Sequence, residues 1–139
     1  MNCSDLNVYF DGRLDNLRPV SSLVERLCHR LGLDETTSYH VELAVVEAVT
    51  NCMRYAFGEE SESRPMHVAA RVEEDALVIS VTDGGEPVEL DLELEPERRP
   101  PDELREGGRG LFLIRSLMDG VEHRSTSAGN ILRMTKALR

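Results

Sequence analysis

The chain has 139 residues, of which 40% are hydrophobic and 30% are charged. This length and composition suit a single globular unit with one packed core, and they exclude a largely disordered chain. The formal net charge of −10 has the wrong sign for a protein that neutralises phosphates, so direct nucleic-acid binding is not expected.

Cysteine usage and hydropathy narrow the cellular setting. The three cysteines, Cys3, Cys28 and Cys52, include no CxxC pair, so neither a disulfide framework nor a zinc site is predicted. The first residues lack the basic start and apolar run of a signal peptide, and no apolar stretch reaches the roughly 18 residues of a membrane span. We therefore expect a cytoplasmic protein without a membrane segment, with one domain over residues 1–139.

The first half of the chain predicts a strand and two helices. Residues 6–10 alternate between apolar and other side chains, which is typical of a half-buried strand. Apolar residues at three- and four-residue spacing predict an amphipathic helix over 17–31, which Gly32 ends. Asp34 is a good N-cap for a second helix that runs to Gly58 and is apolar nearly all round, so we expect it in the interior.

The second half predicts a hairpin, a third helix and two further strands. Residues 66–73 and 76–82 alternate or are β-branched on either side of Glu74 and Asp75, which indicates a hairpin with a short turn. The remaining predicted elements are, in chain order, a helix over the apolar stretch 111–118 and strands near 120–125 and 130–138.

A long acidic segment separates the hairpin from the third helix. Residues 86–106 hold nine acidic residues and three arginines, a net charge of −6, with four prolines and little periodicity. Loops of this length in compact domains are usually functional or disordered. Five of the ten glycines flank this one: Gly84, Gly85, Gly107, Gly108 and Gly110. We interpret residues 86–107 as a lid over a bound ligand, the alternative being an acidic surface insertion.

Two polar residues interrupt the second helix. Glu47 and Asn51 are four residues apart, so both project from one face of an otherwise apolar helix. An unpaired buried carboxylate is costly, so Glu47 needs a partner or a task. Both residues could line a pocket, with the Asn51 amide oxygen offered to a hard cation. An exposed stripe, or a hydrogen bond between the two residues, is the alternative.

Two further features are compatible with a nucleotide. The glycine-rich turn at 107–110 runs into a helix, where free N–H groups and the helix dipole can hold an anion such as phosphate, although glycines also serve plain loop-to-helix entries. Asp83 ends a buried strand before Gly84 and Gly85, and its carboxylate could accept a hydrogen bond from an exocyclic amine or simply cap the turn.

The order of these motifs carries more information than any one of them. The chain resembles the GHKL superfamily of Bergerat-fold ATPases, and within it the small anti-sigma factor serine kinases, over nearly its whole length. The matching motifs are an N-box at Glu47-Ala-Val-Thr-Asn51 followed by Tyr55-Ala-Phe57, a G1 box at Asp83-Gly-Gly-Glu-Pro87, and a G2 box at Gly107-Gly-Arg-Gly-Leu111.

The resemblance implies a role for each matched residue. Asn51 would coordinate the magnesium ion that bridges the ATP phosphates, and Glu47 would act as general base toward the substrate serine. Asp83 would accept from the adenine amino group, Gly85 would leave room for the base, and Thr135 on the last strand would help through a water. The phosphates would face the turn of Gly108, Arg109, Gly110 and Leu111.

The resemblance also implies a function and a fold. The function is an ATP- and Mg²⁺-dependent protein serine kinase that acts as an anti-sigma factor, phosphorylates a serine of an STAS-type anti-anti-sigma protein, sequesters a sigma factor and forms a homodimer. The alternatives are a non-catalytic module that senses ATP or ADP, and an interaction protein without a nucleotide. We expect a two-layer α/β sandwich in which the helices cover one face of a mixed β-sheet.

Overall fold

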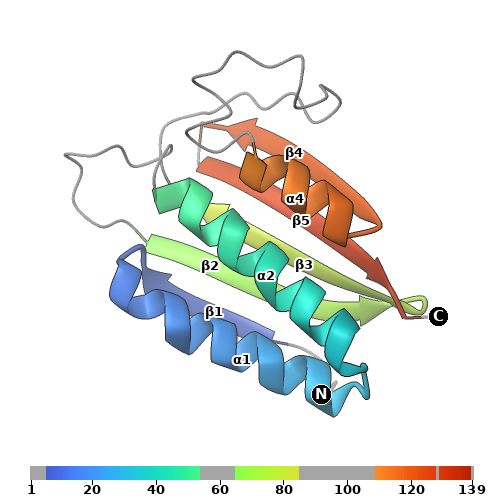
Figure 1. Cartoon of the computed structure of the whole chain (residues 1–139). Helices are drawn as coiled ribbons and strands as arrows, with labels where there is room; N and C mark the ends of the chain where they lie inside the picture. Colours follow the sequence, from blue (N-terminus) through green and yellow to red (C-terminus); the bar gives the residue numbers. More distant parts are fainter. Residues whose placement is uncertain (1–5, 54–64, 85–108, 128, 139) are drawn as a thin grey trace.

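The computed structural model describes residues 6–53, 65–84, 109–127 and 129–138 (Figure 1). The predicted lid at 86–107, Gly85, Gly108 and the end of the predicted second helix at 54–58 lie outside these residues. In the described part, three α-helices cover one face of a five-stranded sheet. The predicted two-layer α/β sandwich is confirmed.

The first helix, α1, spans Leu17–Arg30 and follows a short 3-10 turn. It ends as the sequence predicts, because Gly32 adopts a φ of +78°, a conformation that costs glycine little. The Gly32 N–H donates to the carbonyl of His29 at 3.0 Å, and the Leu33 N–H donates to that of Cys28 at 3.1 Å. These bonds satisfy carbonyls that the helix end would otherwise leave open.

The second helix, α2, spans Glu35–Asn51 and lies between α1 and α4 in the helix layer (Figure 1). Asp34 caps it, since its Oδ1 accepts a hydrogen bond from the Thr37 N–H at 2.7 Å. This hydrogen bond lowers the pKa of Asp34. The central place of α2 confirms the prediction that it lies in the interior, and its apolar character follows from contact with a helix on each side and the sheet below.

The third helix of the described chain, α4, spans Arg109–Leu117. Its C-terminal end is tied to the last strand, because Lys136 Nζ donates to the Leu117 carbonyl at 2.6 Å. The carboxylate of Asp119 accepts from the Ala137 N–H, also at 2.6 Å. A cation at a helix C-terminus also complements the negative end of the helix dipole.

The strands are β1 (Leu6–Asp11), β2 (Pro65–Glu73), β3 (Ala76–Asp83), β4 (Gly120–Thr126) and β5 (Gly129–Ala137), in the order β1-β2-β3-β5-β4. All neighbouring strands described are antiparallel, so the prediction of a mixed sheet is wrong. The crossover through α4 does make β4 run parallel to β3. The β4–β5 hairpin, however, places β5 between these two strands, so they never pair.

The β2–β3 hairpin has the predicted turn. Glu73 pairs with Ala76, and the two residues between them, Glu74 and Asp75, have φ of 46° and 66°. Left-handed conformation at both turn residues matches the right-handed twist of the flanking strands.

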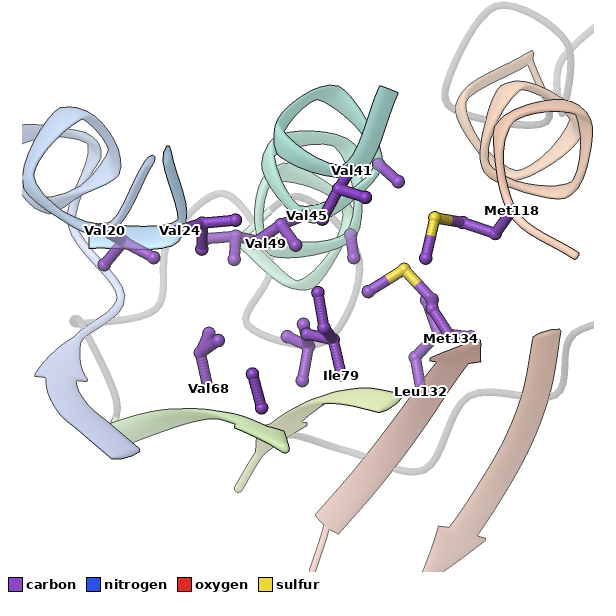
Figure 2. Close-up of a cluster of buried hydrophobic side chains, with 14 of the residues drawn as sticks. Val20, Val24, Val41, Val45, Val49, Val68, Ile79, Met118, Leu132 and Met134 are labelled. Atoms are coloured by element: carbon purple, nitrogen blue, oxygen red, sulfur yellow. The ribbon is translucent and has the colours of Figure 1, made fainter. Parts of the chain in front are cut away.

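The core fills the space between the helices and one face of the sheet (Figure 2). Figure 2 labels its main contributors: Val20, Val24, Val41, Val45, Val49, Val68, Ile79, Met118, Leu132 and Met134. Alternation along the central strand puts Leu77, Ile79 and Val81 on this face, and Asp83 follows them in the same register. None of the described helices is both long enough and apolar enough to cross a membrane.

Replacing Ile79, which is fully buried on the central strand, tests this core. We expect Ile79→Ala to lower the free energy of unfolding by about 2–5 kcal/mol, because it removes buried methyl groups and leaves a cavity. Urea denaturation measures the loss. The control Leu14→Ala, at a side chain that is 71% exposed, should stay within about 0.5 kcal/mol of the parent protein; similar losses in both variants would contradict this packing.

Candidate nucleotide site

Several predicted site residues come together at one end of the sandwich. The C-terminal end of α2, the end of β3, the start of α4 and the turn between β4 and β5 all lie at this end (Figure 1). Glu47 and Asn51 come from α2, Asp83 from β3, and Arg109, Gly110 and Leu111 from the first turn of α4. Residues far apart in sequence therefore share one region, as the motif order predicts.

Glu47 and Asn51 lie one turn apart on the last part of α2, and both are half-buried rather than exposed. The Asn51 Oδ1 atom is buried and has no hydrogen-bond partner among the described residues. This oxygen therefore accepts no hydrogen bond from Glu47 or from the helix backbone. Thr50 beside it behaves differently, since its hydroxyl donates to the Val46 carbonyl at 2.6 Å.

An orphaned amide oxygen fits a hard cation. Buried polar atoms are nearly always partnered, so an open acceptor calls for a ligand that the protein itself does not supply. The described residues hold no group of three or more His, Cys, Asp or Glu able to bind a metal ion without help. A Mg²⁺ ion at Asn51 would therefore take most of its ligands from phosphate and water oxygens, as this ion commonly does beside nucleotides.

Asp83 is the second anchor of the site. It is the last residue of β3 and only 2% exposed, so it does more than cap an exposed turn. Its Oδ1 accepts a hydrogen bond from Asn130 Nδ2 at 3.0 Å, and Asn130 Oδ1 accepts from Ser125 Oγ at 2.9 Å. The register puts the three residues in one row, because Asp83 pairs with Asn130 and Asn130 pairs with Ser125.

Two more titratable side chains surround the Asp83 carboxylate. Burial raises the pKa of the Cys52 thiol well above its usual value, and the charge of Asp83 and a hydrogen bond to it act in the same direction. Burial lowers the pKa of His123, and the charge of Asp83 opposes that shift. The thiol is therefore a neutral donor to the carboxylate, and burial favours the neutral imidazole of His123.

Gly129 sets the distance between the β4–β5 turn and Asp83. Its φ is +139°, and a Cβ atom built on it would lie 1.8 Å from the Asp83 carbonyl oxygen. No side chain fits there, so glycine is required by both conformation and space. From the sequence, this position lies only between the strands predicted near 120–125 and 130–138, because nothing local to 128–130 shows which backbone approaches it.

The glycine-rich turn is described only from Arg109 onward. The helix α4 begins at Arg109, so the N–H groups of Arg109, Gly110 and Leu111 belong to its first turn. N–H groups in the first turn of a helix have no carbonyl acceptor within the helix. The Leu111 side chain is 2% exposed. Leu111 can thus offer its backbone N–H to an anion while its side chain packs inside. Gly85 and Gly108 lie outside the described residues.

The prediction that Thr135 joins Asp83 is wrong. Thr135 pairs with Val78, five residues before Asp83 on β3, while Asp83 pairs with Asn130. At about 3.3 Å per residue, five residues separate the two positions by about 16 Å along the strand, and odd spacing puts them on opposite faces of the sheet. Asn130 takes the place expected of Thr135. The sequence alone could not identify Asn130 as the neighbour of Asp83, because it does not show the pairing register of β3 and β5.

With this geometry in place, comparisons with known proteins identify the family. The profile of the histidine kinase-like ATPase domain matches residues 10–136. The chain belongs to the histidine kinase-like ATPase domain family. Because the match includes the ends of α2 and β3 and the start of α4, the residues gathered at the site lie within the family domain.

Curated relatives narrow the family further. A protein named serine-protein kinase RsbW from Halalkalibacterium halodurans is 37% identical over 83% of this chain and 72% of its own length. The protein of the same name from Oceanobacillus iheyensis is 34% identical over 69% of this chain, and that from Staphylococcus aureus is 36% identical over 70%. The chain spans 63% and 64% of the lengths of the latter two relatives.

Solved structures share the histidine kinase-like ATPase fold described here. The crystal structure of the RsbU and RsbW domains of a Mycobacterium tuberculosis protein matches with a TM-score of 0.70 and 16% identity, over 96% of this chain and 31% of that one. The SiaB-SiaC complex from Pseudomonas aeruginosa matches with a TM-score of 0.64 and 19% identity, over 92% and 88%. At these identities the likeness concerns the fold.

Gly129 offers a direct test of the close approach at Asp83. Gly129→Ala must displace the β4–β5 turn from the end of β3, so we expect a loss of about 1–3 kcal/mol in the free energy of unfolding. Urea denaturation measures it. Gly120→Ala is the matched control, because its Cβ would meet Thr135 at an ordinary 3.5 Å. Equal stability of the two variants would refute the contact.

Proposed function

We propose that this chain is an ATP- and Mg²⁺-dependent protein serine kinase that acts as an anti-sigma factor in partner switching. Its substrate is a serine of an STAS-type anti-anti-sigma protein, and its second partner is a sigma factor that it sequesters. The observation that carries this proposal is the buried, unpartnered Asn51 Oδ1, one helical turn from Glu47. The name of the relatives, serine-protein kinase, supports the reaction type.

Each residue of the candidate site has a task in ATP binding, including Gly85 and Gly108, which lie outside the described residues. The carboxylate of Asp83 accepts a hydrogen bond from the 6-amino group of adenine, since an ionised carboxylate can only accept. The first-turn N–H groups of Arg109, Gly110 and Leu111 donate to phosphate oxygens, together with Gly108, while Gly85 leaves room for the base. Asn51 Oδ1 would hold a Mg²⁺ ion, which would supply neutralisation of the phosphate charge.

Glu47 acts on the substrate serine. Its carboxylate orients the hydroxyl and accepts the proton as the serine oxygen forms its bond to the γ-phosphorus. The bond from that phosphorus to the β,γ-bridging oxygen breaks, and ADP leaves with the electron pair. Positioning and charge neutralisation provide most of the catalysis in such transfers, so Glu47 needs only to be held within reach of the hydroxyl.

Three further features complete the proposal. Residues 86–107 form a lid whose net charge of −6 over 86–106 disfavours ATP unless the cation and the α4 N-terminus offset it. The protein is cytoplasmic, with residues 1–139 as one domain. It forms a homodimer, which the edge position of β1 and the 76% exposed side chain of Tyr9 on that strand support.

Calorimetric titration of ATP, with and without Mg²⁺, tests the binding site. We expect Mg²⁺-dependent binding that Asn51→Ala weakens at least about 10-fold, because it removes the oxygen ligand to the cation. Thr36→Ala, at an exposed residue in the first turn of the same helix, should bind as the parent protein does. If no nucleotide binds to the parent protein under either condition, the kinase assignment falls.

A phosphorylation assay with a cognate STAS-type protein tests the role of Glu47. We expect Glu47→Gln to lower kcat about 10²- to 10⁴-fold while the Kd for ATP changes little, because only proton acceptance is lost. Glu35→Gln, at an exposed glutamate of α2, is the control. An unchanged rate in Glu47→Gln would remove the general base, and ATP binding without transfer by the parent protein would favour the non-catalytic nucleotide sensor.

A further inference from the structure

The face of α2 that points away from the sheet is apolar along most of its length. Residues at three- and four-residue spacing line up on one side of a helix, and Tyr39, Leu43, Val46 and Thr50 form such a line. We name this line the outer stripe of α2. It lies opposite the buried positions of the helix, which are Val41, Ala44, Val45, Ala48 and Val49.

The outer stripe carries apolar side chains where the solvent-facing side of a helix normally carries polar ones. Tyr39 is 62% exposed. Leu43 and Val46 are half-buried, and neither is among the described residues that form the core or pack against it. The Thr50 hydroxyl donates to the Val46 carbonyl at 2.6 Å, so it is already used within the helix. A continuous apolar line of this kind is typical of a surface that another protein covers.

Two carboxylates lie beside the outer stripe and repel each other. Glu42 is on α2 and Glu25 is on the neighbouring helix α1 (Figure 1). Burial raises the pKa of Glu42, and the charge of Glu25 acts in the same direction, while a hydrogen bond from Ser38 opposes the shift. No Lys or Arg among the described side chains pairs with Glu42. A basic side chain of a partner would relieve this repulsion, so the surface favours a partner with Lys or Arg beside its apolar residues.

The outer stripe leads to the carboxylate that acts on the substrate serine. Glu47 follows Val46 directly and lies one turn after Leu43, so it borders the stripe. Tyr39 comes eight residues before Glu47, which is about 12 Å along the helix axis at 1.5 Å per residue. A protein that lies along the stripe therefore has its surface close to Glu47. Binding of the nucleotide makes no use of this face.

We propose that the outer stripe of α2 is the docking surface for the protein that carries the phosphoacceptor serine. Tyr39, Leu43 and Val46 contact an apolar strip on that protein, and Glu42 pairs with a Lys or Arg beside the strip. The inference rests on the proposed function, because it takes Glu47 as the base toward that serine. It adds a surface that selects the protein substrate and is separate from the residues that bind the nucleotide.

Steady-state phosphorylation of the cognate STAS-type protein at saturating ATP and Mg²⁺ tests this surface. We expect Tyr39→Ala to raise the KM for that protein about 10-fold, because exposed aromatic residues often dominate the energy of an interface. The kcat and the Kd for ATP should not change. Tyr39→Phe keeps the ring and should keep the KM. The control Leu14→Ala, at a side chain that is 71% exposed and outside the stripe, should leave all three values unchanged.

The charge next to the stripe has a test of its own in the same assay. Glu42→Gln keeps the shape of the side chain and removes its charge, so we expect the KM for the STAS-type protein to rise about 3-fold at low salt. Added salt should raise the KM of the parent protein more than that of this variant, because salt screens the ion pair only where it exists. An identical salt dependence of the two proteins would contradict the charge pairing.

The remaining outcomes separate the docking surface from the proposed function. Equal KM values for Tyr39→Ala, Leu14→Ala and a parent protein that phosphorylates its substrate would overturn the docking surface and leave the kinase assignment intact. A lower kcat or weaker ATP binding in Tyr39→Ala at an unchanged KM would also overturn it. A change of oligomeric state in Tyr39→Ala, seen by light scattering, would assign the stripe to a second copy of the chain instead. Failure of the parent protein to phosphorylate any STAS-type protein would overturn the proposed function as well.

Discussion

A buried carboxylate at the end of the central strand constrains this molecule more than any other group. Asp83 continues the core-facing register of Leu77, Ile79 and Val81, yet it carries a charge where those residues carry methyl groups. Such a group persists only if it is hydrogen-bonded, and the neighbouring strand supplies Asn130 for the purpose. The pairing of β5 with β3 places Asn130 beside this carboxylate, and at the same place Gly129 lies too close to the Asp83 backbone carbonyl for any side chain.

The sequence could predict the elements because their signals are local. Alternation defined β1, Gly32 ended α1, Asp34 began α2, and the Glu74–Asp75 turn closed the hairpin, each as the structure has it. Asn51 was also singled out locally, as a polar residue in an apolar helix, and Asp83 as a carboxylate at the end of a buried strand. Features that depend on the pairing of distant strands were not predicted correctly from local patterns.

The failures share one cause, which is the insertion of β5 between β3 and β4. Seen from the sequence, the helix between β3 and β4 favours a parallel pair and a mixed sheet. The inserted strand makes all neighbouring pairs antiparallel, and it also brings Asn130 rather than Thr135 beside Asp83. Gly129 went unnoticed for the same reason, because the backbone that it approaches, at Asp83, belongs to a strand more than 40 residues earlier. Strand register is long-range information that spacing along the chain does not contain.

The position of β5 also bears on how the protein forms during translation. The strands β1, β2 and β3 can pair as soon as they leave the ribosome, but the Asp83 side chain gains its hydrogen bond from Asn130 only when residues 129–137 emerge and join β3. Until then the Asp83 carboxylate lies at the edge of an incomplete core. The strand β5 therefore completes the sheet and the surroundings of Asp83 in one step.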